Sequence, residues 1–128
     1  MKYLLDTHVL LWALGDSRLL SRKARSLIAD VANICLFSPV SVSEIAIKHR
    51  KHPDDMPIDA ETARAAFITA GYVELPYSSR HAAAMDGLPP HHSDPFDRML
   101  IAQAMAEHVK LISHDDKVSR YGDVVIPV

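Results

Sequence analysis

The pattern of hydrophobic and polar residues divides the chain into short apolar runs and longer segments with helical spacing. The apolar runs, which are typical of buried strands, cover residues 2–5, 34–37, 72–75, 109–113 and 124–126. The segments with helical spacing cover residues 9–14, 25–29, 45–52, 63–68, 82–85 and 96–106. Residues suited to cap these helices precede most of them: Ser17 or Ser21, Ser41, Asp59 or Thr62, Ser78 or Ser79, and Asp94. Because strands and helices alternate through short connections without a repeat, the pattern predicts an α/β fold, a three-layer α/β/α sandwich around a mainly parallel central sheet.

The helix over residues 96–106 carries the clearest start signal in the chain. Asp94 is a residue type that caps helices, and Pro95 suits the first helical position, where no N–H is needed. Asp97 falls where a capping box places its acid. Most of the following residues are apolar, so we expect this helix to be buried around most of its circumference. An ionised carboxylate in its first turn needs a partner, because burying a charge unpaired is costly.

Four acidic residues occupy related places in this pattern. Asp6 and Asp115 each follow an apolar strand. Asp97 and Glu44 are each expected in the first turn of a helix, the second of these through a capping-box spacing that begins at Ser41. In a parallel α/β sheet, strand ends and the helix starts that follow them lie at one edge, where such folds bind ligands. We therefore expect the four carboxylates to converge.

Converging carboxylates repel one another, and a divalent cation allows them to stay ionised together. Oxygen ligands without cysteine suit Mg²⁺, with Mn²⁺ as an alternative, because both ions bind carboxylates and phosphate oxygens. The sequence thus predicts a metal site in which the same residues serve as ligands and as catalytic groups, namely Asp6, Glu44, Asp97 and Asp115.

Simpler roles compete for several of these positions. Asp97 and Glu44 would also serve as plain capping-box acids, and Asp94 is favoured as a helix cap over a ligand. Arg98 lies four residues after Asp94, a spacing that allows the two to pair. Asp116 competes with its neighbour in the sequence for the last acidic place.

Hydroxyl groups flank two of the acids. Thr7 and Ser113 are placed to hydrogen-bond the carboxylates, and either would equally cap a helix. Asp6 itself has no evident capping duty beyond what Thr7 provides. Trp12 is expected in the core, with the border of a partner groove as the alternative.

Composition narrows the class of protein. The chain has 128 residues, of which 48% are hydrophobic and 23% charged, so residues 1–128 are expected to form one soluble globular domain. We expect neither a membrane span nor a secretion signal, since the longest apolar runs, such as residues 9–14, are short. The single Cys35 lies in an apolar run and is expected as a small core residue in a cytoplasmic protein.

The net charge of −2 means that any nucleic-acid contact must come from a local basic patch. Residues 48–52 form the most basic run, which is expected to be a solvated helix end, with an RNA contact as the alternative.

Four segments resemble, in order, the signatures of PIN-domain proteins: Leu4-Leu5-Asp6-Thr7, Ser43-Glu44-Ile45, Asp94-Pro95-Phe96-Asp97-Arg98 and Leu111-Ile112-Ser113-His114-Asp115. The third resembles the VapC-type toxins of bacterial toxin-antitoxin pairs, and the resemblance spans nearly the whole chain. It implies a PIN-like domain that cleaves RNA as a metal-dependent endoribonuclease, hydrolysing the phosphodiester with metal-activated water. It also implies inhibition by a cognate antitoxin protein and a homodimer. By motif position the four acids named above take the family's acidic places, and Ser113 takes its Thr/Ser place.

Other functions fit the residues less well. A non-catalytic PIN-like binding module would have lost most of these carboxylates, and here none is missing. A phosphatase of the haloacid-dehalogenase type requires a second Asp two residues after Asp6, where this chain has His8. His91 and His92 with Asp94 would suggest zinc, but adjacent histidines in a Pro-containing loop lack the i, i+4 spacing of helical zinc ligands.

Overall fold

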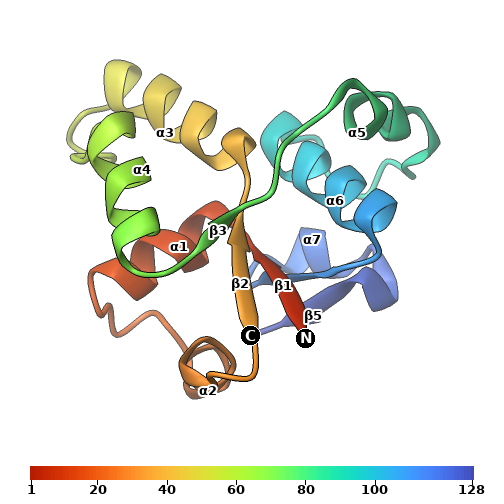
Figure 1. The fold of residues 1–128 in the computed structure, drawn as a ribbon. Coiled ribbons are helices and arrows are strands. Elements are labelled where there is room, and N and C mark those ends of the chain that lie inside the picture. Colours follow the sequence, from red (N-terminus) through yellow and green to blue (C-terminus); the bar gives the residue numbers. More distant parts are fainter.

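A five-stranded parallel sheet forms the centre of the structure, a computed structural model that describes residues 1–128 (Figure 1). The strand order is β3-β2-β1-β4-β5, and every neighbouring pair is parallel. The strands are β1 (Lys2–Leu5), β2 (Ile34–Phe37), β3 (Val73–Glu74), β4 (Lys110–Ser113) and β5 (Val125–Pro127). The predicted α/β fold with a mainly parallel sheet is confirmed.

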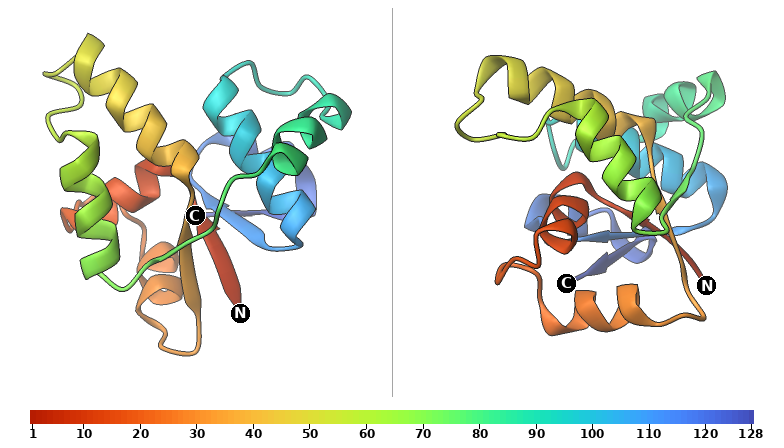
Figure 2. Two further views of the ribbon diagram at one scale, coloured as in Figure 1. Left: turned by 45° about the horizontal axis from the view of Figure 1, so that its top comes forward. Right: turned by 60° about the vertical axis from the view of Figure 1, so that its left-hand side comes forward.

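Helices cover both faces of this sheet (Figure 2). They are α1 (Thr7–Leu14), α2 (Arg22–Ala29), α3 (Pro39–Lys51), α4 (Ala60–Thr69), α5 (Ser79–Ala83), α6 (Pro95–Glu107) and α7 (Asp116–Ser119), with short 3₁₀ turns η1 (Ala84–Gly87) and η2 (Gly122–Val124). The α1, α2 and α4 helices pack on one face, and α6 and α7 pack on the other. None of these helices combines the length and the apolar character needed to cross a membrane.

Side chains of the central strands alternate between two hydrophobic cores. In β1, Tyr3 and Leu5 point into the core beneath α1, α2 and α4, whereas Leu4 points into the core beneath α6 and α7. Cys35 in β2 is buried in the first core without a disulfide partner, as predicted. Because both faces are covered, these strands read in the sequence as continuous apolar runs.

Two helix starts differ from the sequence expectation. The α1 helix begins at Thr7, so Asp6 is its N-cap, and the expectation that Asp6 has no capping duty was wrong. The α3 helix begins at Pro39, not within the segment that follows Ser41, because Ser38 caps it and proline needs no N–H at the first position. Glu44 therefore lies in the second turn of α3 instead of the first.

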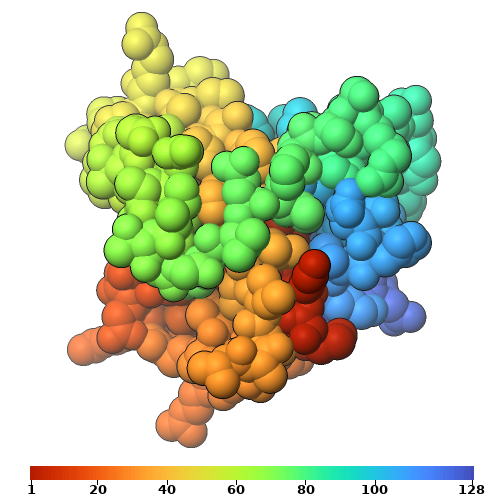
Figure 3. Space-filling model, in the orientation of Figure 1, coloured from red at the N-terminus to blue at the C-terminus, as the bar shows by residue number.

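The α6 helix begins as predicted, with Asp94 as its N-cap and Pro95 at its first position. Its middle is buried on all sides, since residues 100–104 are all buried. Gln103 is the polar member of this stretch, and its side-chain amide donates to the carbonyl oxygens of Leu75 at 2.9 Å and Pro76 at 3.2 Å. These carbonyls belong to the segment after β3, which crosses the surface between α4 and α5 (Figure 3).

Arg98 does not pair with Asp94, contrary to the sequence expectation. Its guanidinium donates to the carbonyl oxygens of Pro89 at 3.1 Å and His92 at 3.3 Å, and to the Tyr121 hydroxyl at 3.1 Å. These three acceptors surround one terminal nitrogen of the guanidinium, whereas Oδ1 of Asp94 accepts the N–H groups at the helix start. Arg98 therefore holds the loop that precedes α6.

Replacing Gln103 with leucine tests how α6 holds the crossing segment. The substitution preserves volume but leaves the carbonyls of Leu75 and Pro76 without their donor, and it should lower the free energy of unfolding by about 1–3 kcal/mol. Chemical denaturation measures this change. Met105→Ala, at an exposed position on the same helix, is the control and should stay within about 0.5 kcal/mol of the parent protein. Equal stability of Gln103→Leu and the parent would show that the carbonyls do not depend on this side chain.

Candidate metal centre

Asp6 lies where β1 ends and α1 begins. Its backbone N–H donates to the Ile112 carbonyl oxygen at 3.1 Å, and its carboxylate accepts the Val9 N–H at 2.9 Å through Oδ1. The residue is 4% exposed. Burial raises the pKa of Asp6, and this effect outweighs the opposite effects of the Ser113 hydroxyl and the Val9 N–H. The carboxylate is thus fixed in place while its ionisation is opposed.

Asp97 projects from the first turn of α6 and is free of any capping duty. Asp94 alone caps the helix, because its Oδ1 accepts the N–H groups of Phe96 at 2.9 Å and Asp97 at 3.1 Å. The return bond of a capping box is absent, since the Asp94 N–H approaches His92 Nδ1 at 3.4 Å. The simpler interpretation of Asp97 as a capping-box acid is therefore wrong.

Asp115 follows β4 and uses its two oxygens differently. Its Oδ1 accepts the N–H groups of Lys117 at 2.8 Å and Val118 at 3.1 Å and so starts α7, a helix that the sequence analysis did not predict. Its Oδ2 lies 3.7 Å from Nε2 of His92. Asp116 is an exposed residue in the first turn of α7, and no contact links it to the other acids. Between these neighbours, Asp115 is the one turned toward the cluster.

Glu44 reaches the same region from the second turn of α3 and is 2% exposed. The Thr7 hydroxyl donates to its Oε1 at 2.7 Å, and the Lys48 ammonium pairs with its Oε2. Burial acts to lower the pKa of Lys48, but the Glu44 carboxylate, together with the charges of Asp94 and Asp97, outweighs it and the pKa is raised. The sequence pattern indicates a solvated helix end at Lys48, whereas the structure pairs this residue with Glu44, and the i, i+4 spacing of the two residues is the signal in the sequence that could have revealed the pair.

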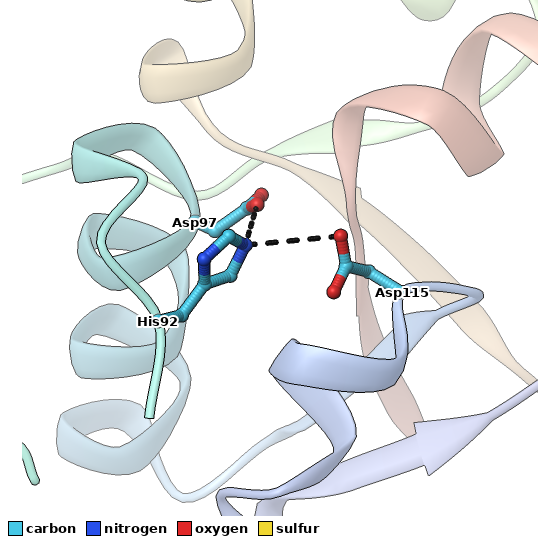
Figure 4. A group of neighbouring side chains, drawn as sticks. All are labelled: His92, Asp97 and Asp115. Carbon is cyan, nitrogen blue, oxygen red and sulfur yellow. Dashed lines mark ion pairs between the residues drawn. The ribbon is translucent and has the colours of Figure 1, made fainter. Parts of the chain in front are cut away.

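His92 is the second residue that the sequence analysis did not place in the site. Figure 4 shows its imidazole facing the carboxylates of Asp97 and Asp115. Its Nε2 lies 2.8 Å from Asp97 Oδ2, and one atom from each of the three side chains lies within 4.8 Å of the others. His91, the adjacent residue, packs its ring edge-on against Tyr121 with centroids 5.1 Å apart. Nothing in the local spacing distinguishes the two histidines, so sequence reasoning had no signal to separate them.

The electrostatics of Asp97 show that the predicted acids act on one another. Burial, followed by the charges of Asp94, Glu44, Asp6 and Asp115, raises the pKa of Asp97 to about 8. The structure therefore brings together all four acids that the sequence singled out, at the carboxyl edge of the sheet. An arrangement in which one carboxylate holds its proton at neutral pH is suited to bind a cation, because a cation favours the ionised form.

A cavity of about 200 Å³ adjoins the acids and is lined by Asp6, His8, Trp12, His114 and Asp115. The Trp12 ring lies between the two imidazoles, with centroid distances of 5.8 Å to His8 and 5.6 Å to His114. Trp12 is half-buried, so it packs on the core and borders this cavity as well. Flat rings beside carboxylates offer a surface on which an unpaired base can stack.

Comparison with solved structures identifies the fold. A chain of VapBC2 from Rickettsia felis, bound to a DNA fragment from the promoter, has a TM-score of 0.68 and 14% identity, covering 100% of this chain and 98% of that one. A toxin-antitoxin complex from Klebsiella pneumoniae has a TM-score of 0.66 and 19% identity, covering 97% of this chain and 95% of that one. VapBC-1 from nontypeable Haemophilus influenzae has a TM-score of 0.59 and 16% identity, covering 94% of this chain and 92% of that one. At these identities the similarity establishes a shared fold.

A search of curated protein sequences gave no match. The family model of the PIN domain, in contrast, matches residues 3–124. This range contains Asp6, Glu44, Asp97 and Asp115. It runs from β1, the first strand, to the 3₁₀ turn η2 just before β5, the last strand. The chain therefore belongs to the PIN domain family.

Proposed function

We propose that this chain is a metal-dependent endoribonuclease that hydrolyses RNA phosphodiester bonds as the VapC-type toxin of a toxin-antitoxin pair in the cytoplasm. Residues 1–128 then form one PIN-like nuclease domain. The observation that carries the proposal is the convergence of four acids at one edge of the sheet, where burial, together with the charges of the neighbouring acids, raises the pKa of Asp97 to about 8. Proteins of the PIN domain family are typically nucleases.

The side chains fit a divalent cation. The donors of Asp6, Glu44, Asp97 and Asp115 are carboxylate oxygens, and the single cysteine lies in the core. Hard oxygen donors with some ligand positions left to water suit Mg²⁺, with Mn²⁺ as the alternative. When bound, such an ion activates water for attack on a phosphodiester and neutralises charge that develops on the phosphate.

The protein's own residues hold these acids and supply a place for the RNA. Asp6 and Asp115 are each fixed by helix N–H groups, so their carboxylates do not turn away from the cluster. Lys48 offsets the charge of Glu44, which lowers the repulsion that the site must overcome. The cavity beside Trp12 is placed to take a base next to the scissile phosphate, since unpaired RNA is commonly recognised by stacking on aromatic rings.

A non-catalytic PIN-like binding module is the alternative. Such a module would need the fold but not the acids, and it would not need to keep a carboxylate whose ionisation is opposed. Asp97 caps nothing and bears this cost, which favours catalysis over a purely binding role.

Asp97→Asn tests the catalytic proposal. The amide keeps the shape of the side chain but removes a ligand charge, so Mg²⁺-dependent cleavage of total cellular RNA should fall by at least about tenfold to a hundredfold. Asp94→Asn is the matched control, because asparagine also caps helices and activity should persist. Asp94→Ala should cost about 1 kcal/mol of stability and leave most of the activity. If Asp94→Asn is inactive while Asp97→Asn cleaves like the parent, the two roles are exchanged; cleavage that survives EDTA would reject the metal mechanism.

Stability without metal should depend on pH through Asp97. Its pKa is about 8 in the folded protein and 3.8 in the unfolded chain, so the folded state holds the proton more tightly. This contribution to stability is fully present below about pH 4 and is lost as the pH rises through about 8. The free energy of unfolding of the parent should therefore fall relative to that of Asp97→Asn over this range. Each pKa unit of difference between the two states corresponds to about 1.4 kcal/mol.

Chemical denaturation of both proteins in EDTA, at several pH values between about 5 and 9, measures this difference. Mg²⁺ should restore the stability of the parent at high pH but have a smaller effect on the variant. Asp116→Asn, which removes an exposed acid outside the cluster, is the control for the loss of one acidic side chain. A pH-independent difference for Asp97→Asn would mean that this carboxyl ionises normally.

We also propose that the protein forms a homodimer and binds a cognate antitoxin. The support is the shared fold with chains of toxin-antitoxin complexes, together with exposed apolar side chains such as Ile68 and Val73. Light scattering at micromolar concentration should give twice the 14.2 kDa mass of one chain. Co-expression with a small protein encoded next to this chain should abolish RNA cleavage. A strict monomer with no inhibitory neighbour would contradict the proposal.

A further inference from the structure

His92 is buried in a way that its protein neighbours do not explain. Its side chain is only 10% exposed, and Nε2 has no hydrogen-bond partner. Asp97 Oδ2 is 2.8 Å away, but the two atoms are not aligned as a hydrogen bond. Buried polar atoms nearly always have a partner, and leaving one without is costly. The unpartnered nitrogen therefore points to a group that is not part of the chain.

The atoms around Nε2 are spaced like ligands of a single ion. Asp97 Oδ2 and Asp115 Oδ2 lie 2.8 and 3.7 Å from it, and the three side chains converge in Figure 4. Ligand atoms bound to one ion at about 2.0–2.2 Å lie roughly 3 Å apart when adjacent in an octahedron and about 3.5 Å apart in a tetrahedron. The two separations from Nε2 bracket these values, and the three ligand atoms all lie within 4.8 Å of one another, so the site is completed when the side chains close on the ion.

The loop that carries His92 is held before any ion arrives. The Arg98 guanidinium donates to the His92 carbonyl oxygen and to the Tyr121 hydroxyl, which itself donates to the Pro89 carbonyl oxygen at 2.7 Å. The Asp94 N–H approaches Nδ1 at 3.4 Å, which is longer than a usual hydrogen bond. An ion on Nε2 requires the imidazole proton to be on Nδ1. Placing it there costs only this long contact with the Asp94 N–H.

We propose that His92 is a nitrogen ligand of the metal centre through Nε2, and that it makes the centre prefer a first-row transition ion to Mg²⁺. The inference rests on the metal site of the proposed function and specifies which ion that site selects. Mg²⁺ favours oxygen ligands and retains its waters, whereas transition ions bind imidazole together with carboxylates. The Asp97 and Asp115 carboxylates supply the remaining protein ligands on this side, and other positions stay open for water and phosphate.

Electron paramagnetic resonance of Mn²⁺ bound to the folded protein tests the proposal directly. Pulsed spectra should show coupling of the ion to a ¹⁴N nucleus, and this coupling should be replaced by ¹⁵N coupling when the parent is labelled with ¹⁵N-histidine. No substitution is needed for this measurement. His92→Gln should abolish the coupling, whereas His91→Gln, the matched control in the same loop, should retain it.

Binding titrations with Mn²⁺ and Mg²⁺ provide the second measurement. His92→Gln should weaken Mn²⁺ binding by about tenfold to a hundredfold and change Mg²⁺ binding by less than about threefold. Absence of nitrogen coupling in the labelled parent, or equal losses for both ions in the variant, would overturn the inference.

Neither readout depends on RNA cleavage. Nitrogen coupling in a protein that cleaves no RNA would reject the nuclease proposal and leave His92 as a ligand. Mg²⁺-dependent RNA cleavage by a protein that shows no nitrogen coupling would support the nuclease proposal and reject His92 as a ligand.

Discussion

Mutual repulsion among carboxylates at the carboxyl edge of the sheet is the constraint around which this structure is arranged. Parallel strands bring Asp6 and Asp115 to the same edge, and α3 and α6 add Glu44 and Asp97 from opposite sides. The surrounding groups then limit the cost: helix N–H groups stabilise two of the acids, Thr7 and Lys48 bind a third, and burial keeps the proton on the fourth. Ionisation is still opposed at two of the acids, at Asp6 because burial outweighs the hydrogen bonds and at Asp97 because burial adds to the charges of the other acids, and a bound cation would favour the ionised form of both.

Local signals in the sequence were enough for the parts of the fold that depend on local physics. The start of α6 was predictable because a cap residue, a proline and a run of apolar residues all agree at one place. The predicted start of α3 was wrong because two possible caps, Ser38 and Ser41, lie close together. The helix begins after Ser38 because proline at position 39 needs no N–H at the first helical position. The α7 helix has four residues, which is too short for any periodicity to appear.

The acids of the site could be predicted because a parallel sheet places the carboxyl ends of its strands at one edge. Knowing the order of strands and helices along the chain was therefore sufficient. Their partners could not be predicted in this way. His92 lies in a loop whose path is set by Arg98 and Tyr121, and such a path depends on contacts between segments far apart in the sequence. Arg98 illustrates the same limit, since its spacing from Asp94 suggested a pair that three better acceptors prevent from forming.

The double use of Asp6 and Asp115 affects how this site would change during evolution. Each is an N-cap, so a descendant that lost the proposed nuclease activity would still be under selection for folding to keep an acid or a similar cap at these positions. Asp97 caps nothing and is released from selection as soon as activity is no longer needed. Among relatives of this chain, the residue at position 97 is therefore a better indicator of a functioning enzyme than the more deeply buried acid at position 6.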